Sequence, residues 1–186
     1  VIDAYMEGLR DYSDKGGNLA NVASVASFFV SRVDTAVDKA LDNVGSLTAK
    51  NLLGKAAIAT AKIAYRVFTE KFSGDRFLAL RSRSPNAQRP LWASTGTKNV
   101  DYSDVLYVES LIGKDTVNTM PPSTLSAFID HGSVGSTVDQ DMPDAVSTIK
   151  ELEDIGINMK EVTGQLLVEG VEQFQNSYNN MISKIG

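Results

Sequence analysis

Apolar residues recur at helical spacing along most of the chain. The first such pattern places four side chains on one face before the turn at Gly16, namely Ile2, Tyr5, Met6 and Leu9. The same spacing predicts further helices over residues 33–44, 53–72, 103–112, 123–131, 144–152 and 160–181. The basic segment 75–89 contains Pro85 and predicts a short helix followed by a loop.

Three short segments have a different pattern and predict strands. Residues 22–30 form a nearly continuous run of small and apolar side chains, which is typical of a strand buried on both faces. Residues 90–94 and 115–119 predict two more strands, the first beginning at Pro90, where proline is tolerated. Strands and helices therefore alternate, which is the pattern of right-handed parallel βα units and predicts an α/β fold.

The number of strands is small for such a fold. An eightfold βα barrel takes about 250 residues, whereas this chain has 186 and three predicted strands. Three strands alone would leave two exposed sheet edges, which soluble proteins avoid. We find no repeat beyond the βα unit and no domain boundary, so we expect residues 1–186 to be a single domain, with the last helix packed across the rest.

Composition excludes several classes of function. Apolar residues make up 42% and charged residues 22% of the chain, the balance of a globular domain, and the net charge of −5 provides no global positive field for nucleic acid. The chain has no cysteine and a single histidine, His131, so thiolate chemistry and a multi-histidine metal site are excluded. We find neither a signal segment nor an apolar stretch of membrane-spanning length, and expect a cytoplasmic protein. Val1 runs directly into a helical pattern, as if the chain began inside an element.

Cations and hydroxyl groups follow two of the predicted strands. Ser27 and Arg32 lie at the end of the first strand, and a Ser-Thr-Gly-Thr segment leads from the second strand to Lys98. Ligands of parallel α/β folds meet the carboxyl ends of the strands, and this combination suits a phosphate. The alternative for Arg32 is a surface ion pair with Asp34 or Asp38. Ser27 is otherwise a packing residue, and Ser94 and Thr95 are weaker candidates still.

Longer motifs carry a resemblance to a known family. Residues 88–99 read Gln-Arg-Pro-Leu-Trp-Ala-Ser-Thr-Gly-Thr-Lys-Asn, residues 102–104 read Tyr-Ser-Asp, and residues 116–121 read Thr-Val-Asn-Thr-Met-Pro. Together with residues 22–34, these motifs resemble the bacterial and plant-type transaldolases. The resemblance covers essentially the whole chain but only the carboxyl-terminal part of the family.

The resemblance implies a (β/α)₈ TIM barrel of the class I aldolase type, of which this chain holds the last three strands and the C-terminal helices. It implies transfer of a dihydroxyacetone unit from sedoheptulose 7-phosphate to glyceraldehyde 3-phosphate, in the pentose phosphate pathway, through a lysine Schiff base and without metal or cofactor. The family's Schiff-base lysine, on the fourth strand, and its catalytic aspartate and glutamate would all lie upstream of Val1. By the same resemblance, strands one to five are missing, no catalytic residue is expected in this chain, and the chain alone is expected to be inactive.

Three residues match the family's phosphate end. Arg32 matches the arginine after the sixth strand, Lys98 the basic residue after the seventh, and Ser27 the serine of the sixth strand. By resemblance they bind the substrate phosphate, so the expected partners are sugar phosphates and the N-terminal part of the same barrel, as a companion chain or a missing segment. Neither nucleic acid nor a membrane is expected as a partner.

Three alternatives remain open from the sequence. The chain could be a non-catalytic phosphosugar-binding or interaction module, or an inactive fragment, or it could be a complete aldolase that uses Lys98 as its Schiff-base amine.

Other polar residues are expected to be structural. We interpret His131 as a cation at a helix end, and Lys55, Lys62 and Lys71 as the solvent-facing side of a helix.

Overall fold

Three parallel strands lie side by side in the order in which they occur along the chain. The computed structural model describes residues 1–185, and in it β1 (Ser24–Phe29) pairs with β2 (Gln88–Ala93), which pairs with β3 (Val117–Thr119). All three predicted strands are therefore present. Pro90, predicted to begin its strand, is instead the third residue of β2. β3 pairs with β2 only from Leu91 onward, so Pro90 precedes this part of the ladder.

Helices follow each strand, as the pattern predicted. β1 runs directly into α2 (Val30–Val44), and the helix predicted over 53–72 is α4 (Ala56–Ser73). The short helix before it, α3 (Leu47–Leu52), was not predicted. The helix cannot begin at residue 53, because Leu53 has an extended ψ of 133° and Gly54 has a φ of +72°, which favours glycine. The chain turns here, and α4 then packs against α2 and the sheet.

The remaining helices agree with the sequence in position but not always in length. The described elements are α1 (Ile2–Asp14), η1 (Leu19–Asn21), α5 (Asp75–Leu78), η2 (Arg81–Arg83), α6 (Leu106–Ser110), α7 (Pro122–His131) and α8 (Met142–Asp154). α6 has five residues, shorter than predicted, because the chain leaves the helical conformation at Leu111. On α7, Leu125 and Ile129 are exposed, so the apolar face predicted for this helix is not covered here.

Helices cover one face of the sheet. Phe28 of β1 and Trp92 of β2 pack edge to face, with ring centroids 5.9 Å apart, on the side where α2, α4, α6 and α8 lie. The main core joins these side chains to residues of the helices, including Val37, Leu41, Ala61, Tyr65, Phe68, Tyr107, Leu111 and Leu152. A smaller cluster forms between α1, η1 and the segment after α5, where Leu9, Leu19 and Leu80 are buried.

The opposite face of the sheet is open. Along β1 the side chains alternate, so that Val25, Ser27 and Phe29 are exposed while their neighbours contact the helices. The prediction of a strand buried on both faces is therefore wrong for this structure, because helices lie on one side only. Arg89 and Leu91 of β2 pair in register with Val25 and Ser27 on this open face.

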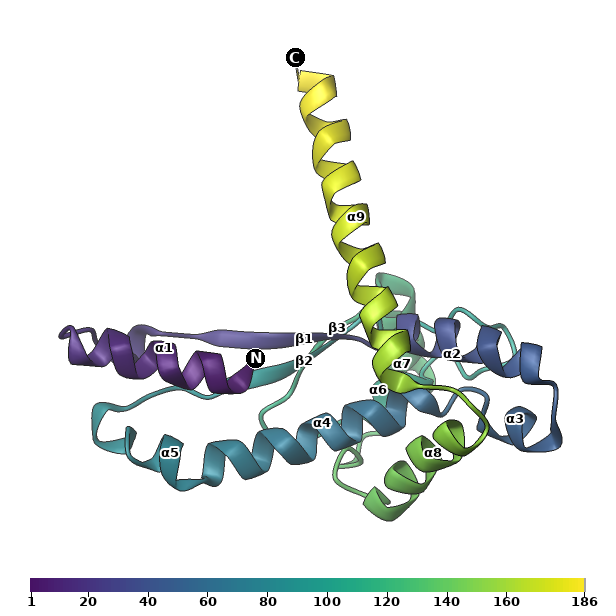
Figure 1. Ribbon diagram of the computed structural model, residues 1–186, viewed down its shortest axis with the longest axis horizontal. Coiled ribbons are helices and arrows are strands. Elements are labelled where there is room, and N and C mark those ends of the chain that lie inside the picture. The colour runs from purple at the N-terminus through teal and green to yellow at the C-terminus, as the bar shows by residue number, and fades with distance from the viewer. Residues whose placement is uncertain (186) are drawn as a thin grey trace.

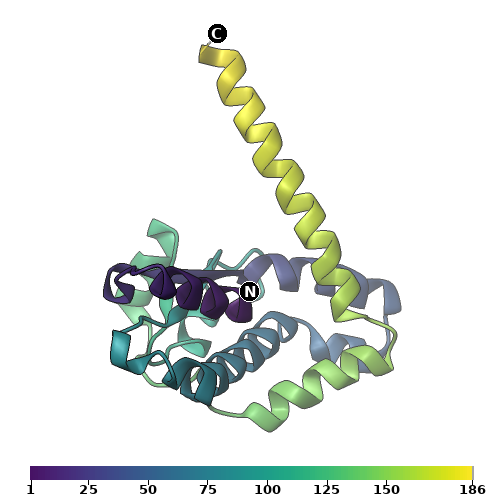
Figure 2. The ribbon, with the colours of Figure 1, turned by 60° about the vertical axis from the view of Figure 1, so that its left-hand side comes forward.

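The last helix, α9 (Met159–Ile185), projects away from the rest of the molecule, in both views of the ribbon (Figures 1 and 2). Only its beginning contacts the core, through Met159, Val162 and Leu166. The expectation that this helix packs across the domain is wrong here, because none of its described residues is buried. Within residues 1–185, no helix is both long and apolar enough to cross a bilayer.

Candidate functional site

The carboxyl end of β1 continues without a loop into α2 and thereby places Arg32. Phe29, the last strand residue, is also the N-cap of α2, so Arg32 lies in the first turn of that helix. The guanidinium carbon of Arg32 lies 4.7 Å from the centroid of the Phe29 ring, a cation–π contact. Arg32 is half-buried, and this aromatic contact restricts the directions in which its guanidinium can point.

Both carboxylates that could pair with Arg32 are engaged elsewhere. Asp34 Oδ1 accepts a hydrogen bond from the Ala57 amide (2.8 Å), and Asp38 Oδ1 accepts one from the Gly54 amide (3.0 Å). Among residues 1–185, no carboxylate lies within 4.0 Å of the Arg32 guanidinium. The surface ion pair considered from the sequence is therefore absent, and the cation is available to an external anion.

Asp34 is a buried acid in the helical layer rather than part of the site. Burial raises the pKa of Asp34 to about 6, although its hydrogen bond from the Ala57 amide and the nearby Tyr107 hydroxyl both act to lower it. Its second oxygen, Oδ2, has no partner with hydrogen-bond geometry among the described residues. The carboxyl group joins α2 to the start of α4 and fixes the direction in which α2 leaves the sheet.

Hydrogen bonds join the carboxyl ends of the three strands to one another. The Ser31 amide donates to the Ser94 carbonyl (3.1 Å), and the two hydroxyl oxygens lie 2.7 Å apart. Thr95, fully buried, donates from Oγ1 to Asn118 Oδ1 at the end of β3 (2.8 Å). Ser94 has a φ of +56°, a left-handed conformation that is uncommon for a residue other than glycine. These bonds fix the positions of the strand ends. They involve Ser94 and Thr95, which were the weakest candidates from the sequence.

The chain beyond Thr95 is pressed against the start of α7. A side chain at Gly96 would bring its Cβ within 3.0 Å of Thr124 Oγ1 and 3.2 Å of Pro121 Cγ, so only glycine fits without displacing neighbours.

Hydroxyl and amide side chains repeated at the strand ends are the signal that could have identified Ser31, Ser94, Thr95 and Asn118 from the sequence.

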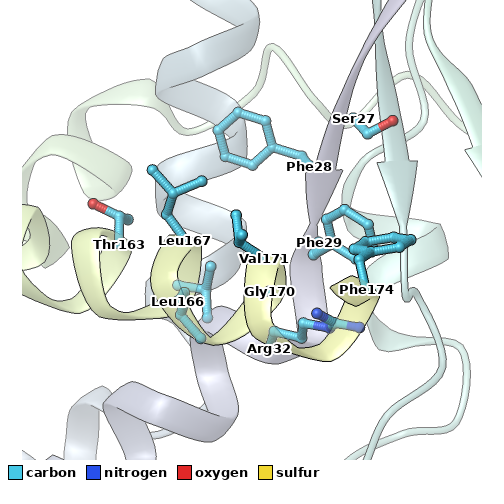
Figure 3. Close-up of a pocket in the computed structure, with 11 residues that line it drawn as sticks. Ser27, Phe28, Phe29, Arg32, Thr163, Leu166, Leu167, Gly170, Val171 and Phe174 are labelled. Atoms are coloured by element: carbon cyan, nitrogen blue, oxygen red, sulfur yellow. The ribbon is translucent and has the colours of Figure 1, made fainter. Parts of the chain in front are cut away.

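Ser27 and Arg32 line the same cavity, which has a volume of about 540 Å³. Figure 3 shows that β1 and α2 form one wall of this cavity and α9 the other. The wall from α9 is apolar apart from Thr163 and consists of Leu166, Leu167, Gly170, Val171 and Phe174. Ser27 and Arg32 thus line the same cavity, and no contact joins their side chains in the described structure.

Lys98 does not line this cavity. It lies on the exposed segment after β2, together with the exposed residues Asn99, Val100 and Asp101. Its position at the carboxyl side of the sheet agrees with the sequence, but its side chain is not gathered with Ser27 and Arg32 around one cavity. Arg32 and Lys98 follow adjacent strands, because β1 and β2 are neighbours in the sheet.

Two other polar residues have structural roles. His131, in the last turn of α7, is exposed and contacts Asp104 through Nε2 (2.9 Å) and Asp130 through Nδ1 (3.2 Å), and hydrogen bonding to Asp104 and then to Asp130 raises the pKa of His131. Lys62 was expected to face solvent, but it is buried and donates from Nζ to the Gln140 carbonyl (3.0 Å). The loop before α8 covers this side of α4 and explains the difference.

No cluster of three or more acidic or histidine side chains suited to a metal ion occurs within the part of the chain that the structure describes. The residues that line the cavity are apolar or glycine, except for the polar side chains of Ser27, Arg32 and Thr163. Such groups bind and orient an anion, whereas the described cavity holds no pair of a nucleophile and a base.

Comparisons with known proteins agree on one family. Residues 2–185 match the family model described as transaldolase/fructose-6-phosphate aldolase. The chain is 46% identical over 183 residues to a transaldolase of Mycolicibacterium smegmatis, covering 98% of this chain and 49% of that protein. It is 44% identical over 186 residues to a transaldolase of Thiobacillus denitrificans, covering 100% and 52%. It is 45% identical over 183 residues to a protein of Streptomyces avermitilis named transaldolase 2, covering 98% and 49%. The chain spans about half the length of these curated relatives.

Proposed function

Because this chain belongs to the transaldolase/fructose-6-phosphate aldolase family, we propose that it forms the carboxyl-terminal part of a transaldolase barrel and provides its phosphate-binding end. The three strands then correspond to strands six to eight of the barrel. Strands one to five come from a companion polypeptide or from an upstream segment. They pair with the sheet edges and cover the open face.

The proposed reaction transfers a dihydroxyacetone unit from sedoheptulose 7-phosphate to glyceraldehyde 3-phosphate. The ketose carbonyl condenses with a lysine amine of the N-terminal part and releases water, and the resulting Schiff base accepts the electron pair of the carbon–carbon bond as that bond breaks. A carboxylate of the same part carries the proton transfers. Because this chemistry needs groups outside residues 1–186, the chain alone is proposed to be inactive. A cytoplasmic location, in the pentose phosphate pathway, stays a prediction from the family resemblance.

Ser27, Arg32 and Lys98 are proposed to bind the phosphate of the substrate. The observation that supports this role most directly is the environment of Arg32, a half-buried cation that lines a cavity beside Ser27 and has no carboxylate partner among the described residues. A guanidinium group binds phosphate through parallel N–H donors, and a fixed anchor lowers the entropy lost when the sugar is oriented. The proposed contribution is therefore positioning and charge neutralisation.

Borohydride trapping with fructose 6-phosphate, read by intact mass under denaturing conditions, tests this proposal. We expect a dihydroxyacetone adduct on the polypeptide that carries strands one to five, and none on Lys98. No adduct on any polypeptide of an assembled barrel would overturn the enzyme assignment and favour a binding module or an inactive fragment. An adduct on Lys98 would instead identify this chain as an aldolase with its own Schiff-base lysine.

Substitution of Arg32 tests the site separately from the chemistry. In the assembled enzyme, Arg32→Ala is expected to raise KM for phosphorylated substrates at least about 10-fold, because a charge-assisted contact is lost. The matched control is Arg66→Ala, which removes an exposed arginine of α4 that pairs only with Glu70 (3.9 Å) among the described residues. A variant at Arg32 that retains the parent affinity for fructose 6-phosphate would contradict the proposed role.

A further inference from the structure

A hydrogen bond joins the segment that carries Lys98 to the helix that carries Arg32. The Tyr102 hydroxyl donates to Asp38 Oδ2 at 2.7 Å, across 64 residues of sequence. Tyr102 follows Lys98 by four residues on the segment after β2, and Asp38 lies on α2, less than two turns beyond Arg32. The bond therefore connects the two elements that deliver the two cations.

Asp38 is fixed from a second direction. Its other oxygen, Oδ1, accepts a hydrogen bond from the Gly54 amide (3.0 Å). Gly54 has a φ of +72°, and a Cβ at this position would lie only 2.9 Å from Tyr102 Cζ, so the phenol ring packs directly on the glycine. Tyr102 is thus held both by its hydroxyl group and by its ring. Burial and then the bond to Asp38 raise the pKa of Tyr102 well above its ordinary value, so the hydroxyl remains a donor at neutral pH.

Local hydrogen bonds also hold the part of the segment that lies between Lys98 and Tyr102. The Tyr102 amide donates to the Asn99 carbonyl (3.3 Å), and Asn99 Oδ1 accepts a hydrogen bond from the Asp101 amide (3.0 Å). At its other end, the segment is held by the bonds between Ser31 and Ser94. Between these two attachments Thr95 and Gly96 are buried, whereas residues 98–101 are exposed, with Val100 at 96%. Without Tyr102, the segment with Lys98 would be attached to α2 at one end only.

We propose that Tyr102 and Asp38 are positioning residues, which hold Lys98 at a fixed place relative to Arg32 so that both cations reach one phosphate group. This inference rests on the proposed function, because it assigns both cations to the same anion. Neither residue touches the substrate in this proposal. Their effect is expected for phosphorylated substrates and not for unphosphorylated ones.

Tyr102→Phe in the assembled enzyme tests this role, because it removes the hydroxyl group and keeps the ring on Gly54. We expect KM for glyceraldehyde 3-phosphate to rise about 3- to 10-fold, the effect of one lost hydrogen bond, with kcat within about twofold. With unphosphorylated glyceraldehyde as acceptor, KM is expected to stay at the parent value. An equal change for both acceptors would overturn the proposal, since general structural damage does not distinguish them.

Four further variants separate positioning from stability. Tyr65→Phe removes a comparable bond, from the Tyr65 hydroxyl to the Lys114 carbonyl (3.0 Å), away from both cations, and is expected to leave both KM values unchanged. In a Lys98→Ala background, Tyr102→Phe is expected to have no further effect on KM, because Tyr102 acts through Lys98. Additive effects of the two substitutions would contradict the proposal. Asp38→Asn retains one acceptor oxygen for two donors and is expected to give a smaller rise in KM than Asp38→Ala.

Binding of inorganic phosphate, measured by calorimetry, tests the inference without catalysis. The parent protein is expected to bind phosphate more tightly than Tyr102→Phe by the same factor as the KM change. If trapping gives no adduct but the phosphate affinities still differ, the proposed enzyme function fails and the positioning role stands. If trapping succeeds and the affinities are equal, the positioning role fails and the enzyme function stands.

Discussion

The two faces of the sheet have opposite environments, although the same strands form both. On the covered face, Trp92 is 1% exposed, packs edge to face with Phe28 and donates from Nε1 to the Leu111 carbonyl (3.0 Å). On the open face, Phe29 is 39% and Val25 is 40% exposed. The covered face therefore stabilises the chain by itself, whereas the open face and the strand ends beside it hold residues available to a ligand or to the remainder of a barrel.

An apolar sequence pattern predicts that side chains are buried, but it does not specify which elements of the structure cover them. β1 carries small and apolar residues on both faces, yet helices of this chain cover only one. The two longest helices differ in the same way in how far they are covered. α4 has seven buried residues and α9 has none, although both carry apolar stripes.

The largest effect is expected on the covered face. Trp92→Ala should lower the free energy of unfolding of this chain by about 3–5 kcal/mol, because it leaves a cavity in the main core. Phe29→Ala, an aromatic truncation of similar kind on the open face, should lower it by less than about 1.5 kcal/mol. Urea unfolding followed by circular dichroism measures both, since Trp92 is the single tryptophan and its removal eliminates that fluorescence signal. Equal losses would remove the distinction between the faces.

The next effect concerns the buried acid in the helical layer. The pKa of Asp34 is raised to about 6 from 3.8, so the folded state binds a proton more tightly than the unfolded state. The stability from this group is present below about pH 4 and is lost as the pH rises through 6, by about 3 kcal/mol in total.

Asp34→Asn should abolish this contribution while its side-chain oxygen still accepts from the Ala57 amide. We therefore expect the variant to become more stable relative to the parent as the pH rises from 4 to 7. Urea unfolding at several pH values measures the difference. A parent-to-variant difference that stays constant with pH would show that Asp34 titrates normally.

A smaller effect is expected on the uncovered helix. Replacing Leu167, Val171 and Phe174 of α9 by serine should change the free energy of unfolding by less than about 1 kcal/mol, because their exposures are 69%, 59% and 69%. Self-association should weaken, since an exposed apolar stripe is removed. Sedimentation velocity measures the association. The control is Leu166→Ser on the same helix, where the side chain packs on the core and a loss of about 1–2 kcal/mol is expected.

The smallest effect is expected at the exposed contact between α7 and the segment after β2. Hydrogen bonding to Asp104 raises the pKa of His131, so the contact favours the protonated ring and weakens as the pH rises through that pKa. Asp104→Asn should lower the titration midpoint of the His131 ring protons toward 6.5, observed by NMR. Asp139→Asn, an exposed acid outside this contact, should leave the midpoint unchanged.

Local chemistry explains how much of the fold the sequence could predict. The run of small apolar residues in β1 and the helical spacing of α2 depend on near neighbours, and both elements appear as predicted. The helix predicted from residue 53 begins only at Ala56, because Gly54 has a left-handed conformation and the Tyr102 ring, 48 residues away, packs on it. The start of β2 was misplaced because Gln88 and Arg89 extend the pairing with β1, which overrides the punctuation by Pro90.

The sequence predicts where Ser27 and Arg32 lie, but not which groups the neighbouring acids bind. Ser27 and Arg32 follow from their place at a strand end, and both line one cavity. Whether Asp34 and Asp38 pair with Arg32 could not be read from spacing, because their actual partners are backbone amides at the far end of α3 and the start of α4. The role of Ser94 was equally hidden, since its conformation depends on the bonds to Ser31.

The order of the strands, β1-β2-β3, has a consequence for how such a sheet can be divided and rejoined. Each strand pairs with the one made just before it, through a crossover that stays local, so no segment threads between distant strands. A cut between two βα units therefore severs one covalent link and no interlocked path. Two pieces separated at such a point can therefore regain the same strand order by pairing side by side, without threading one chain through the other.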